Sequence, residues 1–414
     1  MLPIQFAIAT RMFTMPTSSA TSITEIDHLL SPELIGPHDG VGRLAVVAMS
    51  GGVDSAVTAL VMRERGYRVV GMNLRLFSPA DPVHSVNPCC GIPAMDDARA
   101  TCQVIGVPFY AINMEAEFGE AVINRFVDEY AAGRTPNPCL ECNRHVKFTH
   151  LVHRARLLGA DCLATGHYAR IEQDGDRHRL FRAIDDRKDQ SYVLHTLSPD
   201  QLAFIQFPLG RLTKPQVRTL ARHFGLPVAD KEESQEICFV GKSSYADFVA
   251  KRRPDVTRPG EIVNEAGDVL GAHDGLVHHT VGQRRGIRIA GPSPLYVLHL
   301  DTVGNRLTVG PRDHAVARTL LADGISFTDA AWPDLPFDAM AVVRYRGVPT
   351  QCRVVPGEKG MACIELTGDA QSLPVASPGQ AVVFYRNDEV LGGGTIRTVE
   401  REANHVGHLA KGAQ

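Results

Sequence analysis

Short apolar runs alternate with helix-like segments along the first part of the chain. The apolar run at 44–49 precedes a helix-like segment over 56–65 that stops at Gly66, and a strand-like run follows at 68–77. The same order then repeats, with helix-like stretches at 96–105, 115–132 and 147–158 and strand-like stretches at 107–114 and 161–165. This alternation predicts an α/β fold with a doubly wound parallel sheet that helices cover on both faces.

The alternation ends near residue 244. Glycines, prolines and basic pairs such as Arg252-Arg253 replace it, and beyond 308 short alternating stretches lie between Gly and Pro turns. A length of 414 residues also fits two or three domains of about 150 residues each. We therefore expect a loosely ordered extension, an α/β domain, a small central domain and a C-terminal β-barrel, at 1–40, 41–243, 244–307 and 308–414.

The segment between the first apolar run and the first helix has the composition of a phosphate-binding loop. It reads Ser50-Gly51-Gly52-Val53-Asp54-Ser55. The glycines allow a tight turn with backbone amides facing an anion, the serines add hydroxyl donors, and the helix brings its positive end to the same point. The order strand, loop, helix predicts that a phosphate binds here; a serine–glycine loop without a ligand is the alternative.

Two better-known phosphate motifs do not account for this loop. The nearest echo of the kinase-type loop, at 241–243, has Glu236 where the first glycine should stand, so no P-loop lysine is expected. A dinucleotide fingerprint at 40–45 precedes the strand and lacks the required context. The loop resembles instead the SGGxDS loop of enzymes that split ATP between the α and β phosphates and adenylate a substrate oxygen.

Composition and charge restrict the class of protein and the compartment in which we expect it. A share of 44% apolar and 21% charged residues is ordinary for a water-soluble protein, and no apolar run approaches the ~18 residues of a membrane span. The net charge of −3 does not indicate nucleic-acid binding, although a local basic surface stays open. Nine cysteines, an odd number in a chain without a secretory signal, favour a reducing compartment, and we expect the cytoplasm rather than an organelle.

Three cysteines stand in segments suited to chemistry. Cys139 and Cys142 form a C-x-x-C in a proline-rich stretch at 134–143, which we expect to be a rigid loop joining two helices. The second half of a zinc site is not evident. Cys238 lies close to the expected end of the first domain, and the fold can bring it to the other two.

Six motifs now occur in the order typical of one family: SGGVDS, RTPNPCxxCN, ATGHYAR, KDQSYVL, SQEICF and HTVGQRRGI. Over about 42–400 the chain resembles the tRNA-specific 2-thiouridylases of the MnmA type. The resemblance implies an ATP-pyrophosphatase domain, a central tRNA-binding domain and a β-barrel. It also implies an ATP-dependent sulfurtransferase that replaces O2 of the wobble uridine (U34) by sulfur in tRNAs of the Lys, Glu and Gln type.

The resemblance assigns roles to individual residues. ATP, with Mg²⁺, would contact the loop and two more distant positions: Ala48, Met49, Ser50, Gly51, Gly52, Val53, Asp54, Ser55, Leu74 and Gly166. Cys238 would carry a persulfide received from a sulfur-carrier protein, and Cys142 would act as the nucleophile that releases the sulfur, leaving a transient Cys142–Cys238 disulfide. Contacts to tRNA would come from Asn137, Pro138, Cys139, His167, Lys188, Asp189, Gln190, Arg344, Tyr345 and Gln380. A monomer is expected.

One position departs from the family pattern. Some relatives have an acidic residue, able to act as a general base, where this chain has Cys139. The thiol can act as a base when ionised, or it can join Cys142 and Cys238 as ligands of a 4Fe–4S cluster. No other metal site is indicated. The remaining cysteines at 102, 162, 352 and 363 are interpreted as packing residues, and the pair at 89–90 as a surface loop or a segment near the site.

Several alternatives stay open at this stage. His167 can be a structural histidine, and the arginines at 252, 253, 284, 285 and 288 can form a solvated face rather than a phosphate-binding surface. The protein can also be another adenylating synthetase of the same loop class, such as an argininosuccinate- or NAD-forming enzyme. The paired loop cysteines argue against that function. The intact SGGVDS argues against a binding module that has lost catalysis.

Overall fold

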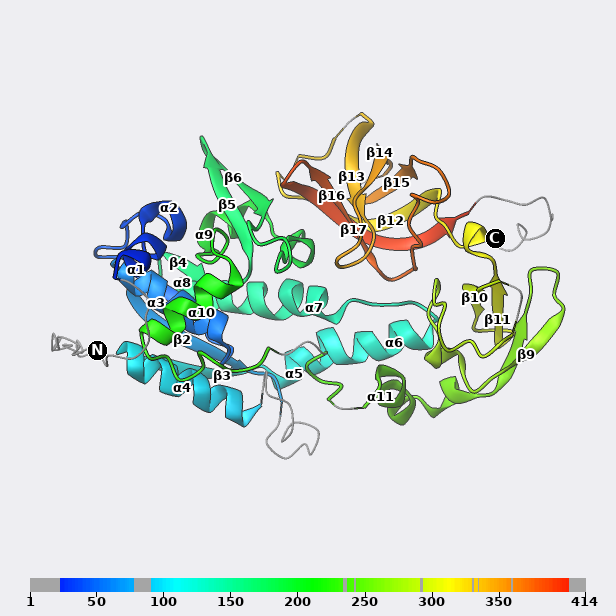
Figure 1. Cartoon of the computed structure of the whole chain (residues 1–414), viewed down its shortest axis with the longest axis horizontal. Coiled ribbons are helices and arrows are strands. Elements are labelled where there is room, and N and C mark those ends of the chain that lie inside the picture. The colour runs from blue at the N-terminus through cyan, green and yellow to red at the C-terminus, as the bar shows by residue number, and fades with distance from the viewer. Residues whose placement is uncertain are drawn as a thin grey trace.

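The structure is a computed structural model, and it describes residues 23–77, 91–233, 237–241, 243–290, 293–329, 331–333, 335–358 and 360–401. The strands form three sheets of five, four and eight strands (Figure 1). Within these ranges, no helix combines the length and the apolar character needed to cross a membrane.

The first sheet confirms the predicted doubly wound fold. Its strand order is β3-β2-β1-β4-β7, and every pair in it is parallel. Side chains of β1 alternate between two cores: Ala45 and Val47 lie in one hydrophobic cluster and Val46 lies in the other. The strands are β1 (Leu44–Ala48), β2 (Arg68–Arg75), β3 (Phe109–Asn113), β4 (Cys162–Ala164) and β7 (Ile205–Gln206).

Two sets of helices cover the two faces of this sheet. The first cluster contains apolar residues of α1, α2, α3, α4 and α10, whose bounds are Ile23–Leu29, Pro32–Ile35, Val53–Glu64, Ile92–Ile105 and Lys214–His223. The second receives residues from the π-helix η2 (Cys142–Leu151), from α8 (Val152–Leu157) and from α9 (Pro199–Phe204). Helix α4 ends at Gly106 in the left-handed conformation, as its glycine stop predicts.

The prediction for residues 1–40 is wrong in its second half. Residues 23–35 include α1 and α2, and their Ile26, Leu29 and Ile35 are buried in the first cluster. The apolar positions are few, and a helix of seven residues has little intrinsic stability, so packing rather than periodicity orders it. Residues 1–22 lie outside the described ranges.

The expected helix over 115–132 is present but is not a uniform α-helix. It consists of α5 (Glu115–Phe118), the π-helix η1 (Gly119–Asn124) and α6 (Arg125–Ala131). The helix expected at 147–158 begins earlier, with α7 (Pro138–Glu141), and continues through η2 and α8. Cys139 and Cys142 therefore stand within the first turns of a helix, and the expectation of a loop at this point is wrong.

The second sheet has the order β10-β11-β8-β9 and belongs to the central part of the chain. Its strands are β8 (Gly260–Val263), β9 (Val269–His273), β10 (Tyr296–Asp301) and β11 (Arg306–Gly310), with α11 (Tyr245–Arg252) and the 3₁₀ turns η4 (Pro254–Thr257), η5 (Leu276–His278) and η6 (Arg312–His314) nearby in sequence. Strand β11 crosses the expected domain boundary at 307/308, so the barrel begins later than the sequence pattern indicates.

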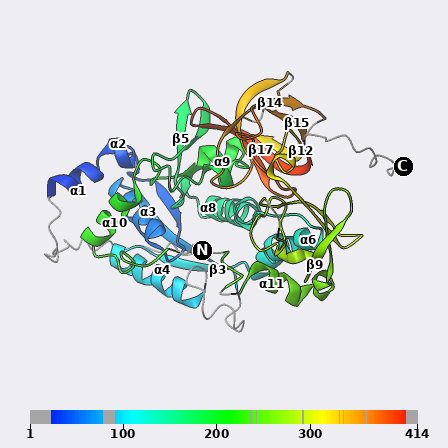
Figure 2. The same ribbon diagram turned by 45° about the vertical axis from the view of Figure 1, so that its right-hand side comes forward.

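Six strands of the third sheet close into the predicted C-terminal barrel, because β12 pairs with both β15 and β17. They are β12 (Thr319–Phe327), β13 (Phe337–Val342), β14 (Thr350–Pro356), β15 (Met361–Leu366), β16 (Ala381–Arg386) and β17 (Glu389–Glu400). A hairpin of the first domain, β5 (Ala169–Asp174) and β6 (Arg177–Arg182), extends this sheet through β6 and β17. In Figures 1 and 2 the barrel accordingly lies on the side of that hairpin and α9.

Helix α1 supplies a test of its place in the core. Leu29 is 3% exposed, whereas Ile23 at the start of the same helix is 77% exposed. Leu29→Ala should lower the free energy of unfolding by about 2–5 kcal/mol, because it removes buried methyl groups and leaves a cavity. Ile23→Ala should stay within about 0.5 kcal/mol. Urea unfolding of both variants measures the difference, and equal effects would show that α1 is not packed as described.

Candidate active site

The loop after β1 is organised by one buried hydroxyl. Ser55 Oγ donates to the Gly52 carbonyl at 2.9 Å and accepts from the Ser50 amide at 3.1 Å and from Ser50 Oγ at 3.2 Å. Gly51 has a φ of 75°, and a Cβ there would lie 2.0 Å from the Ala94 carbonyl oxygen. The loop therefore has the folded turn expected of an anion site, immediately before the start of α3.

The segment after β4 lies directly against this loop. A Cβ on Gly166 would stand 2.9 Å from the Asp54 carbonyl carbon and 2.9 Å from the Ser55 nitrogen, so only glycine fits. On the other side of β1, Asn73 of β2 donates to the Met49 carbonyl at 2.6 Å. Leu74, next along β2, is partly buried between two hydrophobic clusters. These positions gather at the carboxyl ends of β1, β2 and β4, where α/β sheets bind ligands.

Charged side chains from distant segments surround Asp54. Lys214 Nζ donates to both Asp54 carboxylate oxygens at 2.7 Å and contacts Glu233 Oε1 at 3.0 Å. Tyr168 donates its hydroxyl to Asp54 at 2.8 Å, and Lys188 bonds the second oxygen of Glu233. The sequence motifs did not identify Lys214, because its approach to the loop depends on the packing of α10 rather than on local spacing.

Titration behaviour follows from this arrangement. Burial disfavours the charged form of Glu233, but its hydrogen bonds to Lys188 and Lys214 outweigh burial and hold the pKa of that carboxyl below its usual range. Burial, with the neighbouring Asp54 carboxylate, raises the pKa of Tyr168 far above its usual value. Tyr168 is therefore a hydrogen-bond donor to Asp54 at all physiological pH values.

The helix that carries the C-x-x-C begins with a side-chain cap. Asn137 Oδ1 accepts from the Cys139 amide at 3.1 Å and from the Leu140 amide at 3.3 Å, and Pro138 occupies the first turn. Cys139 is exposed, whereas Cys142 is 7% exposed. An Asn-Pro pair before a helix-forming stretch is the sequence signal that could have placed this helix start.

Cys142 and Cys238 share one hydrophobic cluster, although 96 positions separate them. Cys142 is a buried member of this cluster, which we call the aromatic cluster, and Cys238 packs against it as a half-buried residue. The aromatic cluster contains Phe77, Phe118, Phe126, Phe239 and Phe248, and Phe77 follows the carboxyl end of β2. Both thiols thus lie on the same edge of the parallel sheet as the loop.

The structure does not support an iron–sulfur site. Among the residues it describes, no three His, Cys, Asp or Glu side chains lie close enough together to hold a metal ion. The three thiols Cys139, Cys142 and Cys238 therefore do not form the donor set that the cluster alternative requires. Cys102, Cys162 and Cys352 are buried, which confirms them as packing residues, and burial raises their thiol pKa values to about 12. The pair at 89–90 lies outside the described residues.

Residues assigned to tRNA in the first domain also have partners within the protein. His167 Nδ1 lies 2.7 Å from Thr165 Oγ1, and burial, with the Lys147 cation, lowers the pKa of His167 well below its usual value. Gln190 accepts from the Tyr168 amide at 3.0 Å. Asp189 accepts from the Ser191 hydroxyl at 2.8 Å. Gln190 holds the segment after β4 in place, whereas the Asp189 bond is local.

The barrel residues of the same set lie just after β13 and just before β16. Arg344 and Tyr345 are exposed just beyond β13. Gln380, just before β16, donates to the Thr135 carbonyl at 2.7 Å, and the Thr135 amide donates to the Pro378 carbonyl at 2.8 Å. The barrel therefore contacts the segment that leads into Cys139.

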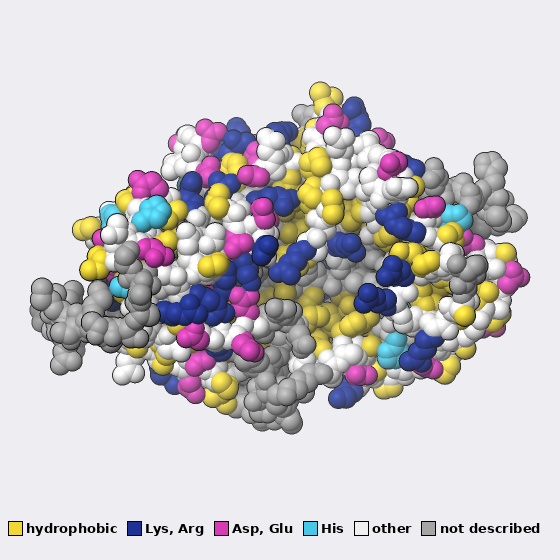
Figure 3. Space-filling model, viewed as in Figure 1, with side chains coloured by type: hydrophobic (Ala, Val, Ile, Leu, Met, Phe, Trp, Pro, Cys, Tyr) yellow, Lys and Arg dark blue, Asp and Glu magenta, His cyan; other side chains and the backbone are white. Residues whose placement is uncertain are grey.

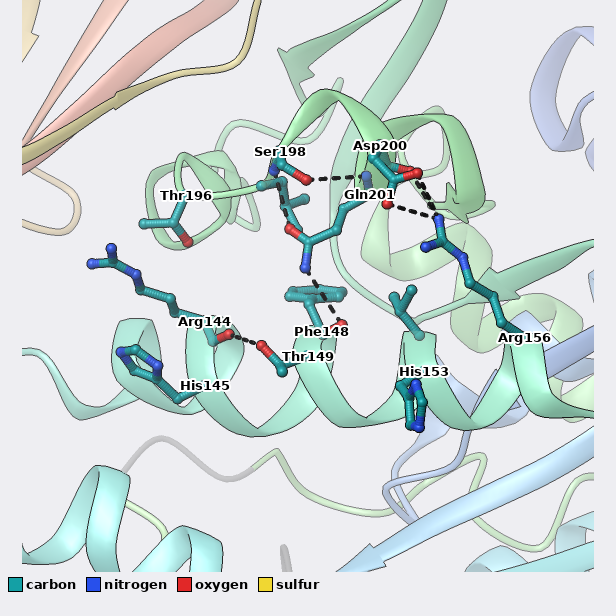
Figure 4. Close-up of a pocket in the computed structure, with 12 residues that line it drawn as sticks. Arg144, His145, Phe148, Thr149, His153, Arg156, Thr196, Ser198, Asp200 and Gln201 are labelled. Atoms are coloured by element: carbon teal, nitrogen blue, oxygen red, sulfur yellow. Dashed lines mark hydrogen bonds and ion pairs between the residues drawn. The ribbon is translucent and has the colours of Figure 1, made fainter. Parts of the chain in front are cut away.

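Basic side chains mark the face between the domains. Lys and Arg side chains gather across the middle of the surface in Figure 3. A pocket of about 480 Å³ lies along η2 and α8, between this helix and the segment leading into α9 (Figure 4). Arg144, His145, His153 and Arg156 line its helix side, and Arg156 pairs with Asp200 at 2.8 Å.

Fold and site together define a three-domain protein with an α/β domain of the ATP-pyrophosphatase type. Three family models match it in chain order: the tRNA methyl transferase HUP domain over 43–242, the tRNA methyl transferase PRC-barrel domain over 246–311, and the aminomethyltransferase beta-barrel domain over 317–396.

Named relatives agree over most of the chain. The tRNA-specific 2-thiouridylase MnmA of Geotalea uraniireducens is 46% identical over 88% of this chain and 98% of its own length. The one from Geobacter metallireducens is 48% identical over 85% and 96%. The chain therefore belongs to the tRNA-specific 2-thiouridylase MnmA family. A solved glutamine-dependent NAD⁺ synthetase from Acinetobacter baumannii has 15% identity over 53% of this chain and 38% of its own, with a TM-score of 0.35, and adds nothing to this assignment.

The cap at Asn137 can be tested independently of function. Asn137→Ala should make amide exchange at Cys139 and Leu140 about fivefold faster, because loss of a side-chain cap costs about 1 kcal/mol. Asn137→Asp keeps an acceptor oxygen and should leave exchange nearly unchanged. Hydrogen exchange followed by NMR measures both variants. Equal protection in Asn137→Ala and the unaltered protein would contradict the cap.

Proposed function

We propose that this chain is a tRNA-uridine 2-sulfurtransferase that uses ATP to replace O2 of the wobble uridine by sulfur. The observation that carries the proposal is the position of the Ser50–Ser55 loop and of Cys142 and Cys238 on one edge of the parallel sheet. Membership of the 2-thiouridylase family supports the same substrate and reaction.

The loop is proposed to activate the oxygen. Its amides and the start of α3 would bind the ATP phosphates, and Gly166 lets the segment after β4 pack directly against the loop at Asp54. O2 of uracil attacks the α-phosphate, the bond to pyrophosphate breaks, and AMP becomes attached to O2. Mg²⁺ would be held mainly by the phosphates, with Asp54 as the nearby carboxylate, and would offset phosphate charge. Adenylation matters because a uracil carbonyl oxygen leaves poorly and AMP leaves well.

The thiols are proposed to supply the replacement. A sulfur-carrier protein transfers sulfur to Cys238 as a persulfide, and the Cys142 thiolate attacks Cys238 Sγ, the inner sulfur of that persulfide. The persulfide bond breaks, the Cys142–Cys238 disulfide forms, and hydrosulfide leaves. Hydrosulfide adds to C2, and the C2–O bond to AMP then breaks. A thiol reductant restores both cysteines, which accounts for the two electrons.

Cys139 and the other residues assigned to tRNA complete the proposal. Cys139 would act as the base when ionised, and its exposure two residues after the helix cap supports this role. Asn137, Pro138, His167 and Gln380 would position the target base, which must leave its stack to reach a buried thiol. We propose a monomer acting in the cytoplasm on tRNAs of the Lys, Glu and Gln type.

Methyl transfer is the second candidate function, because two of the matching family descriptions name a tRNA methyl transferase. A methyltransferase needs a methyl donor and has no use for adenylation of an oxygen. The SGGVDS loop and the thiol pair in the aromatic cluster both serve replacement of oxygen by sulfur. These residues favour thiolation.

Serine variants test the thiol chemistry. Cys142→Ser and Cys238→Ser should each lower 2-thiouridine formation by at least about 1000-fold, since a hydroxyl neither carries persulfide sulfur nor attacks it efficiently. ATP affinity should change less than about twofold. Cys363→Ser, in β15 of the barrel, is the matched control and should keep full activity. Mass analysis of tRNA nucleosides provides the measurement, and normal thiolation by either variant would refute the mechanism.

Gly166 tests where the nucleotide binds. Gly166→Ala places a Cβ 2.9 Å from the backbone of Asp54 and Ser55, so the loop must shift. ATP affinity should fall by about tenfold or more, equivalent to about 1.4 kcal/mol. Gly119→Ala is the control, because a Cβ on that helical residue meets nothing within 4 Å. Calorimetric titration with ATP measures the affinity of each variant. An unchanged affinity in Gly166→Ala would place the nucleotide elsewhere.

A further inference from the structure

Lys214 holds two carboxylates that belong to different parts of the site. Its side chain is 9% exposed, and Nζ lies 2.7 Å from both oxygens of Asp54 and 3.0 Å from Glu233 Oε1. Asp54 belongs to the phosphate loop, whereas Glu233 stands five positions before Cys238. One buried ammonium group therefore connects the loop to the segment that leads to a reactive thiol.

Other contacts fix the same segment to the same loop. Lys231 Nζ donates to the Gly51 carbonyl at 3.0 Å and to Asp97 at 2.6 Å. Lys188 Nζ forms an ion pair with the second carboxylate oxygen of Glu233. Glu233 and Cys238 are five positions apart, which limits their separation to about 17 Å.

We propose that Lys214 and Glu233 are positioning residues that couple ATP binding at the loop to the placement of the Cys238 thiol. The inference rests on the proposed function for the roles of ATP and Cys238, and it adds a link between the two half-sites. Neither residue belongs to the motifs that define the loop or the cysteines.

The coupling has an electrostatic cause. ATP brings several negative charges to a loop where Lys214 is already shared between Asp54 and Glu233. Attraction of the ammonium group toward phosphate weakens its bond to Glu233, and the partly buried setting makes this redistribution stronger than in water. Binding linkage is reciprocal, so a modification that favours one placement of Cys238 must also alter ATP affinity.

The test measures Cys238 directly, without tRNA or sulfur donor. The full chain is treated with iodoacetamide, with and without saturating ATP analogue carrying a methylene group between the α and β phosphates. Mass analysis of the peptide containing Cys238 gives its alkylation rate. We expect the analogue to change this rate by about fivefold or more in the unaltered protein.

Variants of Lys214 and Glu233 test whether these two side chains carry the coupling. Glu233→Gln and Lys214→Gln should bring the ratio of rates close to one at saturating analogue, and Lys214→Arg should restore part of it. Glu232→Gln is the matched control, because Glu232 is exposed and adjacent, and it should keep the full ratio. A ratio of one in the unaltered protein, or an unchanged ratio in Glu233→Gln, would overturn the proposal.

A reciprocal measurement separates this proposal from the proposed function. The analogue is titrated into protein alkylated at Cys238, and its dissociation constant should differ from that of the unaltered protein, whereas alkylation of Glu233→Gln should leave it nearly unchanged. Failure of the analogue to bind the unaltered protein would refute the ATP-dependent function and this link with it. Normal binding with equal affinities before and after alkylation would refute only the link.

Discussion

The site depends on one close contact between two backbone segments. The turn after β4 meets the first turn of α3 at Gly166, where a side chain would collide with main-chain atoms. This contact sets the distance between the loop and the Thr165–Tyr168 segment, and Gln190 fastens that segment through paired hydrogen bonds with Tyr168. Asp54, Tyr168 and Lys214 can meet only because the two backbones approach this closely.

The barrel packs against the first domain and contributes residues to one of its hydrophobic cores. Its Ala381, Val383 and Tyr385 belong to the second core of the first domain. Tyr192 of the first domain donates its hydroxyl to the Ala381 carbonyl at 2.8 Å, and Arg179 forms a bidentate pair with Glu389. Gln380 is bonded to Thr135, so the barrel also holds the segment that leads into the Cys139 helix.

Patterns in the sequence predict those structural features that depend on interactions between neighbouring residues. The glycine after α4, the strand–loop–helix order around Ser50 and the alternation of β1 were legible because each depends on near neighbours. Lys214, the β6–β17 pairing and the burial of Leu29 were missed, since they arise when distant segments pack. The start of the helix at Pro138 was a different kind of error: the Asn-Pro signal was present, but the prolines were interpreted as a rigid loop.

The π-helix η2 fixes the length of the segment that carries Cys142. Cys142 and Val146 belong to the aromatic cluster, whereas Leu151 and Ala155 belong to the second core. In α geometry each residue turns a helix by about 100°, so the number of residues between these contacts determines whether both can face their own cluster. A shortened helix would keep one of these contacts and lose the other. This helix should therefore tolerate substitutions more readily than the loss or gain of a single residue.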